Sequence, residues 1–252
     1  AENINNKLLG VIVQLGGQTP LKLSEFLSKS GIKLLGTSFK SIDLSEDRDS
    51  FNKLMKKLKI NQPKSDIVFN LNEAKNAVKN IQFPIVIRPS YVLGGRAMKV
   101  LNSKKDLELY FKSDFILNNK SILIDEFLIN AKEIDVDAIS DGSDVFIAGI
   151  LEHIEEAGVH SGDSACSLPP QSISKKLIDE IKKITRLITI NLKIVGFINI
   201  QFAIKDEKIF VIEVNPRASR TVPFISKALG IPLANIATKL MLGVPLKKFN
   251  LR

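Results

Sequence analysis

Cysteine is nearly absent from the sequence: Cys166 is the single one among 252 residues, so no disulfide can form within the chain. That usage fits a reducing cytosol. No apolar run reaches the roughly 18 residues of a membrane-spanning helix. The first six residues, AENINN, lack the basic and apolar regions of a signal peptide and also lack an initiator Met. We therefore expect a cytoplasmic protein without a membrane partner, either a piece of a longer chain or one that lost Met before Ala.

The charge is unbalanced. There are 36 Lys and Arg against 27 Asp and Glu, a net charge of +9, which suits an anionic partner such as a nucleotide or a nucleic acid. Many lysines, such as Lys53, Lys56 and Lys57, fall on polar helix faces, and no basic stripe with interleaved aromatic residues is present. Solvated surface charge is therefore favoured over a nucleic-acid footprint. A hydrophobic content of 44% supports a globular protein of one large domain or two modest ones.

The first 40 residues predict a strand, a helix and a second strand. The apolar run at residues 8–14 and the shorter one at residues 32–35 are typical of buried strands. Between them, Thr19 is expected to cap a helix that begins at Pro20 and stops at Gly31. This order is that of the tail of a parallel α/β unit.

After residue 40 the pattern is mixed α+β. Apolar spacing predicts helices at residues 51–62, ended by Pro63, and at 72–79, 106–111 and 175–192, the last capped by Ser174. Strands are predicted at residues 85–88, 122–125 and 133–139, and as a hairpin at 196–204 and 209–214. Because several strands follow one another as hairpins, we expect a largely antiparallel sheet after residue 84.

A glycine turn between two arginines stands out at residues 88–98, which read RPSYVLGGRAM. It follows a short apolar run, as a loop at a strand end would. It is neither a Walker A loop nor a G-x-G-x-x-G fingerprint. Its parts are still those of an anion cradle.

Polar side chains gather on one face of the predicted hairpin. Asn199 and Gln201 share a face of the first strand, and Glu213 and Asn215 share a face of the second. The turn places Gln201 within about one residue of Glu213. A carboxylate with carboxamide oxygens suits Mg²⁺, although a solvated sheet face remains the alternative.

Two arginines follow directly after these polar residues in the sequence, in EVNPRASR (residues 213–220). Guanidinium groups bind phosphate bidentately and stabilise a transferring phosphoryl group. Arg217 and Arg220 next to Glu213 therefore favour a functional site over an ordinary loop.

Small polar residues also cluster in HIEEAGVHSGDS (residues 153–164), which favours a loop against a ligand, with a plain connecting loop as the alternative. The spacing of His153 and His160 is not that of a zinc site. Ser161 and Ser164 lack a base and an orienting acid, so a catalytic triad is rejected. Cys166 is expected to be a small packing residue.

Together these segments resemble the ATP-grasp module in the second half of carbamoyl-phosphate synthetase large subunits. The similar segments are GGQTPLKL (16–23), EDRDSF (46–51), RPSYVLGGRAM (88–98), DEFL (125–128), KEIDVDA (132–138), EHIEEAGVHSGDSACSLP (152–169), NIQFA (199–203) and EVNPRASRTVPFISKALG (213–230). They span nearly the whole chain.

The resemblance implies an α+β ATP-grasp fold, in which two lobes clasp ATP, preceded by the tail of an α/β domain. It implies that residues 1–45 belong to that tail and residues 46–252 to the ATP-grasp domain. Within the latter, residues 82–130 would form the smaller glycine-loop lobe and residues 131–245 the metal-binding lobe.

The resemblance also implies the site residues. Arg48, Arg88, Gly94 and Gly95 would meet the phosphates. The backbone at Glu126 and Leu128 would read the adenine, and Glu133 the ribose. The remaining implied residues are Gly158, Val159, His160 and Ser161 beside the nucleotide; Gln201, Glu213 and Asn215 as ligands of Mg²⁺ or Mn²⁺; and Arg217 and Arg220, with Arg88, around the transferred phosphoryl group and carbamate.

The implied reaction is phosphorylation of carbamate by ATP to carbamoyl phosphate, feeding arginine and pyrimidine synthesis. The implied partners are a glutaminase small subunit and the first ATP-grasp half, so the chain alone is not expected to complete the overall reaction. Three alternatives stay open: a biotin-carboxylase-like ligase, a basic nucleic-acid-binding module, and a nucleotide-binding fragment without turnover.

Overall fold

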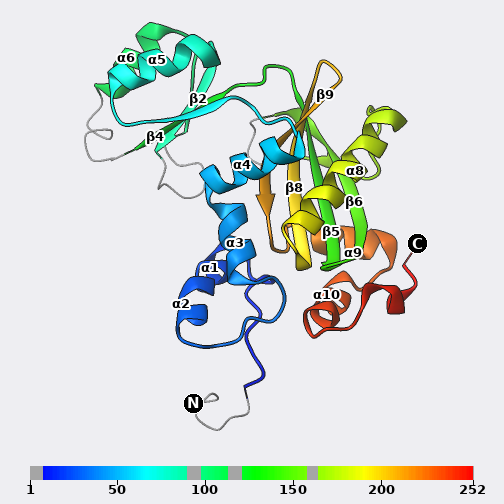
Figure 1. The fold of residues 1–252 in the computed structure, drawn as a ribbon. Helices are drawn as coiled ribbons and strands as arrows, with labels where there is room; N and C mark the ends of the chain where they lie inside the picture. Colours follow the sequence, from blue (N-terminus) through cyan, green and yellow to red (C-terminus); the bar gives the residue numbers. More distant parts are fainter. Residues whose placement is uncertain (1–7, 90–97, 113–120, 158–163, 252) are drawn as a thin grey trace.

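The strands of the computed structural model, which describes residues 8–89, 98–112, 121–157 and 164–251, form two antiparallel sheets (Figure 1). The small sheet has the order β1 (Ser65–Val68), β4 (Ile122–Glu126), β2 (Ile85–Pro89), β3 (Lys99–Leu101). The large sheet has the order β7 (Cys166–Ser167), β6 (Val145–Glu156), β5 (Lys132–Asp141), β8 (Val195–Lys205), β9 (Lys208–Asn215). All the strand pairs in both sheets are antiparallel, which confirms the expectation for the chain after residue 84.

Helices cover these sheets and precede them (Figure 1). They are α1 (Gln18–Leu21), α2 (Ser24–Lys29), α3 (Phe39–Glu46), α4 (Arg48–Leu58), α5 (Leu71–Ile81), α6 (Lys104–Phe111), α8 (Lys175–Asn191), α9 (Val222–Leu229), α10 (Leu233–Met241) and a 3₁₀ turn at Leu246–Phe249. Within the described ranges, none of these helices has the length and apolarity needed to cross a bilayer.

The small sheet packs one face against α5 and α6. Alternation along β2 buries Ile85 and Ile87 in that core, with Ile122 and Ile124 of β4 beside them. The alternate residues point to the opposite face, among them Arg88 of β2 and Asp125 of β4. Alternation along these two strands therefore places one cation and one carboxylate on the face away from the helices.

The large sheet has cores on both faces. Ile134 and Val136 of β5 pack with residues of α8 on one face, and Leu151 and Phe197 pack with residues of α9 and α10 on the other. Figure 1 shows α8 lying along the sheet. Asp135 and Asp137 of β5 alternate with Ile134 and Val136 and face the side of α9 and α10, where Thr221, the N-cap residue of α9, donates a hydrogen bond to Asp137.

The N-terminal segment differs from its prediction. The two expected strands are reduced to one parallel bridge, between Val11 and Leu34. The expected cap at Thr19 is wrong, because α1 already begins at Gln18, after Gly17 with φ of 75°. A φ in this left-handed region favours glycine, and the helix begins directly after Gly17, two residues before the expected start at Pro20.

Two further boundaries also move. Helix α4 ends at Leu58 instead of running on to Pro63, because Lys59 adopts a left-handed conformation with φ of 56°. The segment HIEE is not a loop, since β6 continues to Glu156 and pairs His153 with Cys166 of β7. His153 is buried where it meets an acidic side chain, so polarity did not exclude a strand. Cys166 packs against the core around α9 and α10, which confirms its expected role.

One lobe boundary needs correction. The proposed start of the smaller lobe at residue 82 lies after β1 and α5, yet β1 pairs with β4 and α5 lies in the same core. That lobe therefore begins near Ser65. The proposed division at residue 45 falls within the last turn of α3.

The cap of α8 gives a first prediction. Ser174 Oγ accepts a hydrogen bond from Leu177 N at 3.4 Å, as its position before the apolar stripe predicts. Replacing Ser174 with alanine is expected to lower the free energy of unfolding by about 1 kcal/mol, because an N–H at the helix start loses its acceptor. Urea denaturation would measure this. Ser28→Ala, at an exposed position inside α2, is the control and should change stability by less than about 0.5 kcal/mol.

Candidate functional site

The hairpin β8–β9 has the predicted register. Gln201 lies opposite Glu213, and Asn199 lies opposite Asn215. The two asparagines are only 3% and 4% exposed, whereas Glu213 is exposed. Within the described part of the chain, no side chain forms a hydrogen bond with the Glu213 carboxylate. The face is therefore not a uniformly solvated one: it is buried at one end and presents an available carboxylate at the other.

Arg217 lies beside this pair, on the loop that leaves β9. Its Nη2 donates to Asn215 Oδ1 at 3.2 Å, and its Nη1 donates to Ala218 O at 3.2 Å. Its Nε donates to Gln18 Oε1 at 3.0 Å. Arg220 is exposed further along the same loop. The guanidinium of Arg217 is thus fixed from three sides next to the predicted metal set.

Two more arginines meet one carboxylate between the small sheet and α4. Asp125 of β4 pairs with Arg48, the first residue of α4, and lies 3.9 Å from Arg88 Nε of β2. Burial raises the pKa of Asp125, although both arginines favour its charged form. Burial lowers the pKa of Arg48, which the charges of Asp125 and Glu213 oppose. The influence of Glu213 shows that Arg48 lies near the hairpin face.

Strand β5 supplies a buried acidic row. Asp135 and Asp137 are 5% and 1% exposed, in register with Gln201 and Asn199 of β8. Asp135 Oδ2 is 3.1 Å from His153 Nε2, and Asp137 Oδ1 accepts from Asn199 Nδ2 at 3.2 Å. Burial raises the pKa of Asp137 to about 6, although hydrogen bonds from Thr221, Ser219 and Asn199 oppose this shift.

His153 sits between acidic groups. Its Nδ1 is 4.0 Å from Glu133 Oε1, and its ring is almost fully buried. Burial lowers the pKa of His153, but the hydrogen bond and the charge of Asp135, with Glu133 and Glu155, outweigh it and leave the pKa raised. The side chain of Glu133 is therefore fixed at the start of β5, next to a group that carries positive charge more readily than an ordinary histidine.

The chain between the sheets carries the remaining described candidates. Glu126 is tied to Lys64, since its N–H donates to Lys64 O at 2.8 Å and its Oε2 accepts from Lys64 N at 3.1 Å. Leu128 is buried with Ala131 and Ala203. Among the described residues, none accepts a hydrogen bond from the N–H of Leu128. A backbone donor next to an apolar surface is thus available in the connection between β4 of the small sheet and β5 of the large sheet.

Some expected residues cannot be placed. Gly94 and Gly95, and the run Gly158, Val159, His160 and Ser161, lie outside the described residues. The residues that the structure does bring toward one region are Arg48, Arg88, Gln201, Glu213, Asn215 and Arg217.

Sequence reasoning missed several neighbours of the site. No local pattern in the sequence marks Asp125, Gln18 or Glu46 as site residues. Gln18 Nε2 donates to Glu46 Oε2 at 2.6 Å. Desolvation raises the pKa of Glu46, the Gln18 bond lowers it, and the Glu213 charge raises it again. Glu46 therefore lies near Glu213, a proximity that no local sequence pattern signals.

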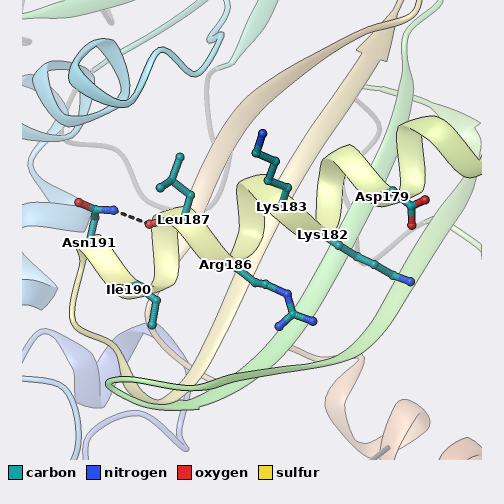
Figure 2. A pocket seen from close by; sticks show the side chains of 7 residues that line it. All are labelled: Asp179, Lys182, Lys183, Arg186, Leu187, Ile190 and Asn191. Carbon is teal, nitrogen blue, oxygen red and sulfur yellow. Dashed lines mark hydrogen bonds between the residues drawn. The ribbon is translucent and has the colours of Figure 1, made fainter.

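Two hollows in the described surface differ in their relation to this site. The larger, of about 530 Å³, is lined only by residues of α8, which Figure 2 shows along the helix. They are Asp179, Lys182, Lys183, Arg186, Leu187, Ile190 and Asn191. A single helix face without converging polar groups from other elements is not a ligand site. The smaller hollow, of about 440 Å³, is lined by His153, Glu155 and Lys132 among others, and so adjoins the acidic row.

Comparison with known proteins decides the family. The sequence model described as "Carbamoyl-phosphate synthase L chain, ATP binding domain" matches residues 47–249. The chain belongs to this family. The resemblance inferred from the sequence is thereby confirmed.

Individual relatives support the same carbamoyl-phosphate synthase family. The carbamoyl phosphate synthase large chain of Archaeoglobus fulgidus is 53% identical over 98% of this chain and 23% of its own length. The large chain of Campylobacter jejuni is 55% identical over 92% of this chain and 21% of its own length. A C-terminal section of the large chain from Aquifex aeolicus is 51% identical over 95% of this chain and 45% of its own length. The chain thus spans less than a quarter of the two longer relatives.

Solved structures show the fold. A biotin carboxylase from Campylobacter jejuni superimposes with a TM-score of 0.77 at 18% identity, covering 97% of this chain and 56% of that one. D-alanine-D-alanine ligase from Helicobacter pylori superimposes with a TM-score of 0.70 at 18% identity, covering 94% of this chain and 73% of that one. The carbamoyl-phosphate synthase family member described here therefore has the α+β ATP-grasp fold.

Proposed function

We propose that this site transfers the γ-phosphoryl group of ATP to carbamate, as one module of a larger carbamoyl-phosphate synthase. The observation that carries the proposal is the hairpin face. An available carboxylate, Glu213, and a carboxamide, Gln201, stand opposite each other beside a guanidinium, Arg217, that is held from three sides. Phosphoryl transfer requires metal ligands, cations and positioning more than covalent help from the protein.

The metal would be Mg²⁺ or Mn²⁺, held by Gln201, Glu213 and Asn215. The donor set fits, because all three offer oxygen atoms and Glu213 has no described hydrogen-bonding partner. Asn215 Oδ1 also accepts a hydrogen bond from Arg217 Nη2 at 3.2 Å. When bound, the metal would supply positive charge that offsets the negative charge of the transferring phosphoryl group.

The nucleotide would lie between the two sheets. Its adenine would meet the N–H of Leu128 and the backbone of Glu126, and its ribose would meet Glu133. Arg48 and Arg88 would face the phosphates, with Gly94 and Gly95 over them. The remaining contacts would come from Gly158, Val159, His160 and Ser161.

Carbamate would bind beside Arg217 and Arg220. One of its oxygens would attack the γ-phosphorus, and the bond from that phosphorus to the β-phosphate oxygen would break, so that ADP leaves with the electron pair. The nucleophile is already an anion, so no general base is needed. The two arginines would offset the charge of the anion and of the transferred group. In the full enzyme, a glutaminase subunit and the first ATP-grasp half would supply carbamate.

The reverse reaction tests this function with the chain by itself. Incubated with ADP, carbamoyl phosphate and Mg²⁺ or Mn²⁺, the chain is expected to form ATP, and chelation of the metal should stop it. Parallel assays with biotin and bicarbonate, and with D-alanine, should give no ATP-dependent product. A chain that binds no nucleotide would contradict the proposal, and a chain that carboxylates biotin would replace it with the biotin-carboxylase reading.

A further inference from the structure

The backbone on both sides of Arg217 is held by one buried residue of the N-terminal segment. Gln14 Nε2 donates to Pro216 O at 2.8 Å, and Ala218 N donates to Gln14 O at 2.8 Å. Gln14 is fully buried, and its Oε1 accepts from Thr37 N at 2.9 Å. A contact across 202 residues of sequence therefore fixes the chain just before and just after Arg217.

The side chain of Arg217 is held from the same segment, four residues later. Gln18 Oε1 accepts from Arg217 Nε at 3.0 Å, while Gln18 Nε2 donates to Glu46 Oε2 at 2.6 Å. The carboxamide can satisfy both neighbours in only one orientation, with oxygen toward the cation and nitrogen toward the carboxylate. Glu46 thus fixes Gln18, and Gln18 fixes the guanidinium.

The bonds of Arg217 leave it partly free. An arginine carries five N–H donors. Arg217 gives Nε–H to Gln18, one N–H of Nη1 to Ala218 O and one N–H of Nη2 to Asn215 Oδ1. One N–H on each terminal nitrogen remains, a pair suited to a bidentate anion contact.

We propose that Gln18 is a positioning residue: it turns the two remaining N–H groups of Arg217 toward the transferred phosphoryl group, with Glu46 as its anchor. The inference rests on the proposed function and deepens it. A merely structural Gln18 would tie the N-terminal segment to the loop without affecting phosphoryl transfer. The two roles differ in what a substitution changes.

The test measures ATP formation from MgADP and carbamoyl phosphate, with carbamoyl phosphate affinity of the MgADP-saturated chain as a second readout. Gln18→Ala is expected to lower kcat about tenfold, because a bond to a charged group is lost, and to leave the KM for MgADP unchanged. Gln171→Ala is the matched control, since that exposed carboxamide bonds Pro169 O away from the arginines. It should leave both constants unchanged.

Exchanging the amide and the carboxylate between residues 18 and 46 makes the test more specific. Gln18→Glu places two carboxylates side by side and should lower kcat at least as much. Combining it with Glu46→Gln restores a donor facing an acceptor and should recover most of the rate. In addition, Gln18→Ala should cost little in an Arg217→Ala background, because its effect passes through Arg217.

The outcomes distinguish a failure of the proposed function from a failure of the positioning role of Gln18. A wild-type chain that binds neither MgADP nor carbamoyl phosphate overturns the proposed function, and the inference with it, before any variant is made. A wild-type chain that binds both without turnover is judged on the affinity, by the same tenfold criterion. If Gln18→Ala matches wild type in both readouts, or adds its full effect to that of Arg217→Ala, the positioning role is wrong while the proposed function stands.

Discussion

Replacing Glu213 with alanine is expected to remove metal-dependent nucleotide binding. Glu213 is the carboxylate of the oxygen set on β8–β9 and has no described hydrogen-bonding partner to lose. A divalent ion at such a site contributes several kcal/mol of charge stabilisation, so we expect affinity for MgATP to fall by roughly 100-fold or more. Calorimetric titration with a non-hydrolysable ATP analogue, with and without Mg²⁺, measures this. Without Mg²⁺, wild type and variant should bind alike or the variant slightly better, because the carboxylate repels phosphate.

Two further variants make that result specific. Glu213→Gln keeps the shape and one oxygen but loses the charge, so its affinity should fall between those of wild type and Glu213→Ala. Glu180→Ala removes an exposed carboxylate from α8 and should bind as wild type does. Equal affinity of Glu213→Ala and wild type in Mg²⁺ would place the metal elsewhere and remove the main support for the proposed function.

The hairpin site was predictable because its information is local. Alternation fixes which side chains share a strand face, and a short turn fixes which residues stand opposite each other. Gln201 and Glu213 therefore faced each other on sequence grounds, and the structure has that register. The cap of α8 at Ser174 followed from similarly short-range chemistry.

The contacts around Arg217 were not predictable, because they join distant parts of the chain. Gln18 accepts a hydrogen bond from Arg217 across 199 residues, whereas the local pattern around Gln18 predicted only the start of a helix. The burial of His153 was hidden for a related reason. A polar run looks like a loop until its partner, Asp135 on the neighbouring strand, is known. The resemblance to a known family predicted site residues that neither residue spacing nor strand alternation indicated.

A second large effect is expected from Asp137, in the stability of the fold as a function of pH. Burial holds its pKa at about 6 instead of 3.8. Below about pH 4 the carboxyl is protonated in both states and costs nothing. Between about pH 4 and 6 the unfolded chain ionises while the folded chain keeps its proton, so stability falls as pH rises. The shift corresponds to about 3 kcal/mol, fully present above about pH 6.

Asp137→Asn removes this titration while keeping an oxygen for the Thr221 hydroxyl. The unfolding free energy of the variant minus that of wild type should therefore rise by about 3 kcal/mol between about pH 4 and 7, measured by urea denaturation along the pH series. Taking the difference cancels the titrating groups that do not interact with Asp137, and the slope does not depend on how Asn199 re-pairs.

Asp141, at the other end of β5, is the matched control because its shift has the opposite sign. Although burial opposes ionisation, hydrogen bonds from the backbone of Asp144, Leu246 and Ser143 lower its pKa to about 2. Its stabilising effect is lost only as pH falls below about 4, so Asp141→Asn should be destabilising by a constant amount between about pH 4 and 7. A flat difference for Asp137→Asn over that range would mean that the site holds Asp137 ionised, with Asn199 and Thr221 outweighing its burial. Asp137 would then carry a buried negative charge that its hydrogen bonds from Asn199 and Thr221 stabilise.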